Sequence, residues 1–408
     1  MRSLFIFLAL TIGIARAEDL DFATALQLAE HNTPQLAAES NKIAAARAAA
    51  IPANALPDPK LLVGVENVPI SGAERGNLNS DFMTMEKIGV MQEFTNADKR
   101  HARADIANAT VARAVAEQLV TRQKIRADVA QAWLQRFYLE QQRAVLDALQ
   151  RENNLLQQAV DAQLASGKAN SADALLPREE ALTVADRRDA LDQQIENAKA
   201  QLAQWIGNEA YLPLTGALPE FAVETGALNK SLHRHPELAA FVPMTQQAEA
   251  ELREAQAQKK SDWGVELAYQ RRGPLYADMV SVQITYDLPV FAGSRQNPLI
   301  ESKKHALEKI DNERSAMLRE HAAQLAADSA QYRTLTLQLQ RLRQARLPLA
   351  QQRVDVTLAS YRTAQSDLAS AINARRDLLE LQLRKNDLER EQRQLAAKLF
   401  YTYEEVAQ

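Results

Sequence analysis

The sequence contains no cysteine, which excludes disulfide bonds, thiolate metal ligands, thiol nucleophiles and lipid-modified cysteines. Glycine and proline are scarce, with 12 and 14 in 408 residues, and aromatic residues make up only 5%. This scarcity of helix breakers, with abundant Ala, Leu, Gln, Glu and Arg, favours long helices over a collagen-like or disordered chain. The net charge of −4 gives no electrostatic reason to expect a nucleic-acid partner. No apolar run reaches about 18 residues, so we expect no membrane-spanning helix.

The first 17 residues have the pattern of an export signal. Arg2 supplies a positive end, residues 4–14 form an apolar stretch too short to span a bilayer, and Ala15-Arg16-Ala17 provides a small-x-small cleavage site. A helix of the mature fold is the alternative. We predict that residues 1–17 are removed and that the mature protein is exported.

The remaining sequence contains an internal duplication. The segment His-Asn-Thr-Pro-Gln-Leu-Ala-Ala at 31–38 reappears as His-Arg-His-Pro-Glu-Leu-Ala-Ala at 233–240. Residues 90–94 and 164–167 have counterparts at 284–288 and 361–364, at a nearly constant offset. We therefore predict two structural repeats, 18–213 and 214–408. Each should contain a helix, two strands, a long helix, a tight turn and a second long helix.

Long helices are expected at 95–164, 170–206, 294–361 and 366–403. In the second repeat, apolar residues recur every seven positions and predict a coiled-coil seam. The two series are Leu325, Tyr332 and Leu339, and Leu335, Leu342, Leu349 and Val356. We expect Asn96 and Ser294 to cap helix starts, and Pro348 to kink or loosen its helix.

Strands are expected at 61–68, 84–94, 263–271 and 280–288, where apolar and polar residues alternate. Their length suits tilted strands that cross an outer membrane, although soluble hairpins packed on the helices would show the same alternation. Four strands leave two open edges, which lipid does not tolerate. Because known spanning barrels begin at about eight strands, a membrane location requires several chains to pool their strands.

This layout resembles the TolC family of trimeric outer-membrane efflux proteins over essentially the whole mature chain. Besides the duplicated order, the resemblance rests on Phe94-Thr95-Asn96, Phe291-Ala292-Gly293 and the turns after Leu164 and Tyr361. The stretches 56–61, 81–85 and 89–94 look most like the CusC- and CzcC-like branch of heavy-metal efflux.

The resemblance implies a mainly α fold with a small β part. Three chains would form a 12-stranded barrel in the outer membrane above a 12-helix periplasmic tunnel. It further implies a passive duct that docks through a periplasmic adaptor to an inner-membrane RND pump. The resemblance to the heavy-metal branch implies that the exported substrates are heavy-metal cations. Without cysteine, attachment to the membrane would rest on the barrel and not on a lipid anchor.

The resemblance also implies functional residues at the ends of the long helices. A periplasmic gate would use Asp173, hydrogen-bonded to Tyr361, and Asp367 as the nearest acid for a ring of three; Ser366 stands where a second link needs arginine. The alternative is that Asp173 caps its helix and Tyr361 packs in the seam. The expected adaptor contacts are Ser166, Gly167, Lys168, Arg362, Thr363 and Ala364.

No catalytic arrangement is evident, and we expect neither an enzyme nor a cofactor. His233 and His235 are separated by one residue, and His235 directly precedes Pro236. No third ligand is apparent, so no metal site is expected. Met83, Met85 and Met91 would share one strand face, which favours a lipid-facing or barrel-core role over metal binding. The alternative functions are a non-transporting periplasmic coiled-coil scaffold and an adaptor.

Overall fold

The structure is a computed structural model that describes residues 19–167, 170–223, 228, 232–363 and 365–404. The expected export signal at 1–17 lies outside the described residues. The chain forms two compact units. The helical unit comprises Met1–Leu36, Thr121–Leu232 and Ala322–Gln408, and the sheet unit comprises Ala37–Val120 and His233–His321. Each unit takes segments from both predicted repeats, so the boundary at 213 and 214 stays a prediction.

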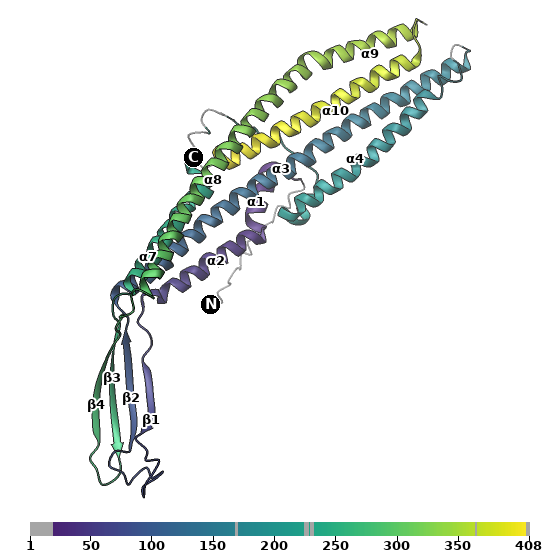
Figure 1. Cartoon of the computed structure of the whole chain (residues 1–408). Helices are drawn as coiled ribbons and strands as arrows, with labels where there is room; N and C mark the ends of the chain where they lie inside the picture. Colours follow the sequence, from purple (N-terminus) through teal and green to yellow (C-terminus); the bar gives the residue numbers. More distant parts are fainter. Residues whose placement is uncertain (1–18, 168–169, 224–227, 229–231, 364, 405–408) are drawn as a thin grey trace, which may run out of the picture. The chain divides into compact units, whose positions relative to one another are not determined.

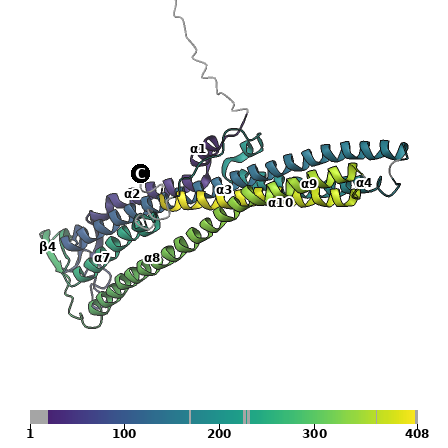
Figure 2. The ribbon, with the colours of Figure 1, turned by 90° about the horizontal axis from the view of Figure 1, so that it is seen from above.

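Most of the helical unit consists of long helices. It contains α1 (Phe22–Asn32), α4 (Leu176–Ile206), η2 (Gly207–Tyr211), α9 (Leu347–Arg362), α10 (Leu368–Leu399), the π-helical turn η5 (Phe400–Glu404) and the C-terminal parts of α3 (Ala97–Ala165) and α8 (Gln296–Arg341). Figures 1 and 2 show α9 and α10 side by side as one antiparallel hairpin. The expected mainly α fold with a small β part is confirmed.

The main core of the helical unit surrounds Trp133, which is fully buried. Its ring stacks on Phe137 with the centroids 5.4 Å apart and meets Phe22 edge to face at 5.5 Å. Leu20 and Leu202 are also fully buried in this cluster. Aromatic pairs of this geometry add stability beyond the area that they bury, so this cluster fixes α1 against α3 and α4.

The predicted seam of the second repeat holds only as far as Leu342. Leu325, Leu335, Leu339 and Leu342 are buried, but Leu349 and Val356 are each 64% exposed. A π-helical turn at Leu342–Arg346 precedes α9, and the N–H of Leu347 donates to the Leu342 carbonyl. This turn adds a residue to the helical repeat and moves the seam to Leu347, Val354 and Tyr361. Pro348, which lacks an N–H, lies two residues after this turn, so the expected loosening of this helix is confirmed.

Only one of the two expected helix caps forms. Asn96 accepts the N–H of Asp98 at 2.9 Å, as expected for the residue before α3. Ser294 does not cap α8, because the helix begins at Gln296 and the Ser294 hydroxyl instead donates to the Phe291 carbonyl. The cap at Ser294 was therefore a wrong prediction.

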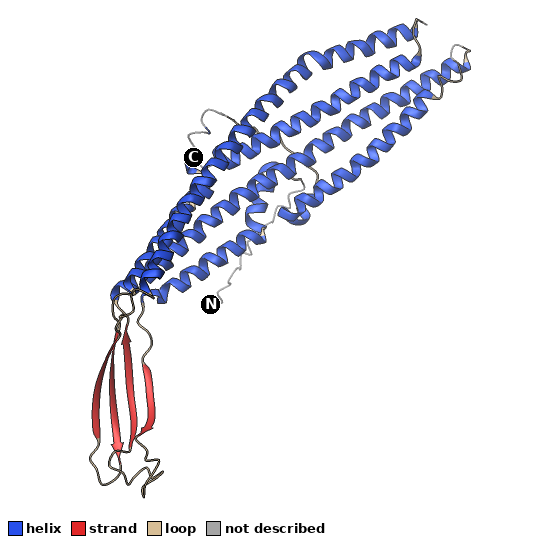
Figure 3. Ribbon diagram, in the orientation of Figure 1, coloured by secondary structure: helices blue, strands red, loops and turns tan. Residues whose placement is uncertain are grey.

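The sheet unit carries all four named strands in one antiparallel sheet, drawn in red in Figure 3, in the order β1-β2-β3-β4 (Figure 1). These are β1 (Lys60–Glu66), β2 (Met85–Phe94), β3 (Trp263–Arg272) and β4 (Met279–Tyr286). The rest of the unit comprises most of α2 (Pro34–Ala50), η1 (Ile51–Asn54), most of η3 (Leu232–Arg234), α6 (Pro236–Ala239), α7 (Phe241–Ala257) and the first parts of α3 and α8. None of the helices in the described residues is long and apolar enough to cross a membrane.

Candidate functional site

One face of the sheet is apolar and exposed. Paired residues form rows across the strands: Leu61 with Val90, Leu267 and Val282, and Val63 with Ile88, Tyr269 and Val280. These side chains are 44 to 75% exposed, and no described helix of the sheet unit covers them. Within the sheet unit the hairpins therefore do not pack on helices, contrary to the alternative of soluble hairpins. An apolar surface of this kind indicates an interaction site.

The opposite face of the sheet is charged. Lys87 contacts the carboxylates of Glu266 at 2.5 Å and Glu66 at 3.1 Å, so that β1, β2 and β3 are linked across the face. Gln270 donates to the Ser281 hydroxyl at 3.3 Å and adds β4 to the same face. The two faces thus differ sharply in polarity.

Met85 and Met91 lie on the charged face with Lys87, because residues two apart along a strand point to the same side. Met83 precedes β2 and belongs to neither face. The lipid-facing interpretation of these methionines is therefore wrong, since the exposed apolar face is the opposite one. Their barrel-core role stays a prediction.

The turns that end α3 and α9 lie close together in the helical unit. The Tyr361 hydroxyl donates to Gln163 Oε1 at 3.0 Å, and the Tyr361 ring packs on the cluster of Val160, Leu368 and Ile372. Burial, and after it the nearby Asp173 carboxylate, raises the pKa of Tyr361. Sequence reasoning missed Gln163, since an amide two residues before a helix end has no distinctive pattern.

Asp173 does not hydrogen-bond Tyr361 within the described part of the chain. Its N–H donates to Asn170 Oδ1 at 2.8 Å, and its carboxylate accepts the Asn170 N–H at 3.4 Å. The helix cap considered for Asp173 is also absent, because α4 begins three residues later after Leu175 with no side-chain cap. A link between Asp173 and Tyr361 of neighbouring chains stays a prediction.

Asp367 is the cap of α10. Its carboxylate accepts the N–H of Ser370 at 2.8 Å, and the hydrogen bonds from Ser370 lower the pKa of Asp367. Of the expected adaptor contacts, Ser166 and Gly167 close the turn after α3, where Gly167 has a φ of 71°. Arg362 and Thr363 close the turn after α9, and Lys168 and Ala364 lie outside the described residues.

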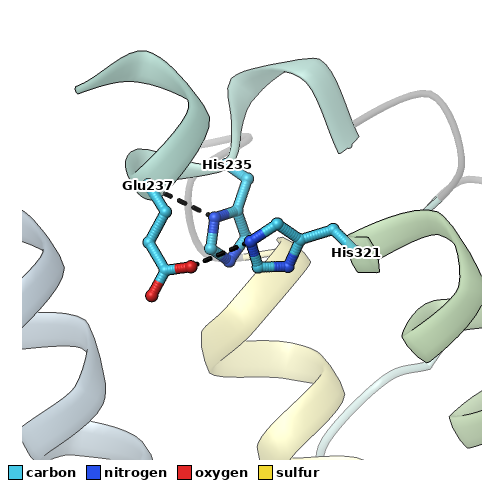
Figure 4. A group of neighbouring side chains, drawn as sticks. All are labelled: His235, Glu237 and His321. Carbon is cyan, nitrogen blue, oxygen red and sulfur yellow. Dashed lines mark hydrogen bonds and ion pairs between the residues drawn. The ribbon is translucent and has the colours of Figure 1, made fainter. Parts of the chain in front are cut away.

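A group of two imidazoles and one carboxylate lies in the sheet unit (Figure 4). Its members are His235, Glu237 and His321, and one ligand atom from each lies within 4.8 Å of the other two. His321 Nε2 is 2.8 Å from Glu237 Oε2, and the two imidazole rings are 4.0 Å apart, centroid to centroid. This is the one such group of three or more His, Asp or Glu residues in the described part of the chain.

Local sequence explains the position of His235. Pro236 begins α6 and favours an extended conformation in the residue before it, where His235 has φ −53° and ψ 131°. His235 Nδ1 accepts the N–H of Glu237 at 3.2 Å, which turns the ring toward the Glu237 side chain. Burial, and after it the neighbouring His321, lowers the pKa of His235 to about 4, so its imidazole is neutral at neutral pH.

His233, which lies two residues before His235 in the sequence, is exposed and outside this group. The third member, His321, comes from α8 and is distant in sequence. Neither the spacing of residues nor their composition connects it to His235.

No known family model and no curated protein matches the sequence. Solved structures do share its fold. The outer membrane protein VceC from Vibrio cholerae aligns with a TM-score of 0.78 at 18% identity, over 93% of this chain and 95% of VceC. A CusC structure, from work on its folding and transmembrane channel formation, aligns with a TM-score of 0.78 at 14% identity, over 94% of this chain and 91% of CusC. A membrane protein from Pseudomonas aeruginosa aligns with a TM-score of 0.79 at 15% identity, over 95% and 93%.

The chain has the fold of outer-membrane channel proteins. This agrees with the TolC-like layout expected from the duplicated sequence. CusC is no more similar than VceC, so the likeness does not single out the heavy-metal branch.

Proposed function

We propose that this chain is the outer-membrane channel component of a tripartite efflux system and acts as a passive duct, not as an enzyme. The observation that carries the proposal is the sheet with one exposed apolar face and one charged face. Strands of a membrane barrel alternate in this way, because one side meets lipid and the other meets the aqueous lumen. A periplasmic coiled-coil scaffold or adaptor would gain nothing from an uncovered apolar sheet.

Closure of the sheet supports a homotrimer. Within the chain, β1 and β4 each pair on one side only, and lipid does not tolerate such open edges. The four strands alternate in direction, so β4 of one copy can pair antiparallel with β1 of the next. Three copies then close a barrel of 12 strands. The same proposal includes export through the signal at residues 1–17. It also includes attachment to the membrane by the barrel, without a lipid anchor.

Two neighbouring residues of β4 provide a test. Val282 is 66% exposed on the apolar face, whereas Ser281 points to the charged face. A lysine on the lipid face near the bilayer midplane costs about 2–4 kcal/mol, whereas a lumen-facing lysine avoids this cost. We expect the parent protein to require detergent for extraction, to elute as a trimer and to conduct in planar bilayers. Val282→Lys should reduce the inserted trimer severely, and Ser281→Lys should retain it.

Recovery of the parent in the aqueous periplasmic fraction would contradict the proposal. So would equal trimer yields for the two lysine variants, because the faces would then not differ in environment. A trimer that inserts but fails to conduct would separate membrane attachment from channel function.

The pump-linked partners and the substrate are further parts of the proposal. A periplasmic adaptor would contact the turns around Gly167 and Thr363 and connect the duct to an inner-membrane RND pump. Heavy-metal cations are proposed as substrates because of the sequence motifs at 56–61, 81–85 and 89–94. Deletion of the gene should lower tolerance to at least one of copper, silver, zinc, cobalt and cadmium; unchanged tolerance to all five would remove the metal assignment but leave the duct.

A further inference from the structure

We propose that His235, Glu237 and His321 form a binding site for one divalent transition-metal cation of the zinc class. The site does not depend on channel function, since a cation bound here would join α8 to the residues around α6 whatever the duct carries. Its chemistry is that of two imidazoles and one carboxylate, a ligand set that suits Zn²⁺ and leaves a fourth position for water.

The geometry is close to that of a bound cation. Tetrahedral Zn²⁺ with bonds of about 2.0–2.1 Å places its ligand atoms about 3.3 Å apart. In this structure Glu237 Oε2 and His321 Nε2 are 2.8 Å apart, and all three ligand atoms fit within 4.8 Å. The Glu237 side chain is 42% exposed and free to adjust, whereas that of His321 is only 14% exposed. Small side-chain rotations therefore complete the site.

Proton balance also allows cation binding. His235 Nδ1 holds the Glu237 N–H in a long bond of 3.2 Å, so the proton of the neutral ring is on Nε2. A cation either replaces that N–H at Nδ1, or binds Nε2 after the ring proton has moved through solvent to Nδ1, which then no longer accepts the Glu237 N–H; the ring stays neutral in both cases.

The first repeat shows that the fold does not require these ligands. At the matching positions it has Thr33 and Gln35 in place of His235 and Glu237, and Thr33 is buried before Pro34 as His235 is before Pro236. There the Thr33 hydroxyl, not an imidazole, binds backbone carbonyls, among them that of Trp205. The same local turn is thus built without metal-binding side chains, so the imidazole and carboxylate of the second repeat need another explanation.

The test is titration of the full mature protein in detergent with Zn²⁺ alone, after the purification tag and bound metal have been removed. Calorimetry should give one Zn²⁺ per chain. His321→Gln, and the pair His235→Thr with Glu237→Gln, which restores the residues of the first repeat, should each weaken affinity by at least about 10- to 100-fold. His305→Gln is the matched control, because His305 also lies on α8 between two glutamates, Glu301 and Glu308, but has no second imidazole near it in the described structure.

Co²⁺ provides an independent readout. The parent should show the visible absorption of a four-coordinate nitrogen and oxygen site, and the His305 variant should show the same spectrum. An unchanged far-ultraviolet circular dichroism spectrum and thermal unfolding curve of the variant with His235→Thr and Glu237→Gln establish that its loss of binding is not a loss of fold. The proposal is overturned if the parent binds no Zn²⁺, if His321→Gln binds as the parent does, or if His305→Gln loses affinity equally.

Discussion

Arg136 offers a quantitative test of how the helical unit is held together. Its side chain is 2% exposed, and it donates from Nη1 to the Ala210 carbonyl at 2.6 Å and from Nη2 to the Leu212 carbonyl at 2.7 Å. Its Nε contacts Glu140, which is 32% exposed. One guanidinium thus fixes the segment that follows α4 to the side of α3.

We expect Arg136→Met to free this segment. Two carbonyls lose a charged donor, and each hydrogen bond of this kind contributes about 1.5–3 kcal/mol. Removal of the charge also removes the cost of burying it, which offsets part of this loss. The free energy of local opening should therefore fall by about 3 kcal/mol, which corresponds to roughly a 100-fold increase in the amide exchange rate. For Arg136→Lys we expect a loss of opening free energy about half that of Arg136→Met, because an ammonium group lacks the planar fork that reaches both carbonyls.

Hydrogen exchange with mass spectrometry measures this opening directly. The N–H of Leu20 donates to Pro213 and that of Thr215 donates to Leu20, so these two amides report whether the segment is docked. Arg143→Met is the control, because Arg143 lies on the same helix in a solvent-exposed pair with Asp192 and should change exchange very little. The reasoning is refuted if Arg136→Met exchanges like the parent, since burial of the charge would then cancel its hydrogen bonds.

Two further predictions concern the ends of the long helices. Tyr361→Phe and Asp173→Asn should each raise single-channel conductance, since one hydrogen bond of about 1 kcal/mol shifts an open–closed ratio about fivefold per chain; unchanged conductance in both would exclude a latch at these turns. Asp367→Ala should speed amide exchange at Ser370 and Asp367→Asn should not, because asparagine also caps. The carboxylate cap has a lowered pKa, so its contribution is complete above the ordinary value of 3.8 and is lost as pH falls through the lowered value. A protection factor at Ser370, that is, the intrinsic rate divided by the observed rate, that does not fall with acid would contradict this.

The helices and strands could be predicted because each depends on a periodic pattern within one segment. Alternation at 263–271 and 280–288 predicts strands whether or not a partner is known, and the observed β3 and β4 differ from those ranges by two residues or fewer. The exposure of Leu349 could not be predicted, because a heptad assumes an unbroken α-helix. The π-helical turn before Pro348 shifts the register, and only the backbone reveals it.

The face assignment of the methionines failed for a related reason. Alternation shows that Met85 and Met91 share a side of β2, but Lys87 stands between them on that same side. Lys87 becomes informative only once the strand register brings Glu66 and Glu266 to it from β1 and β3. The polarity of a sheet face is a property of several strands together, and a single strand does not determine it.

The group of His235, Glu237 and His321 also could not be predicted from one segment of the sequence alone. In the duplicated segments, His235 differs from Thr33 and Glu237 from Gln35, and these differences are visible in the sequence. Their meaning depends on His321, which α8 brings to hydrogen-bond distance of Glu237 from 84 residues away. Divergence between the repeats therefore identifies a place where the second copy carries side chains that the shared turn does not require, and His321 is the third residue of the proposed cation site there. The variant with His235→Thr and Glu237→Gln should fold, assemble and no longer bind Zn²⁺. That result would show that the turn has only a structural role in the first repeat and also binds a cation in the second.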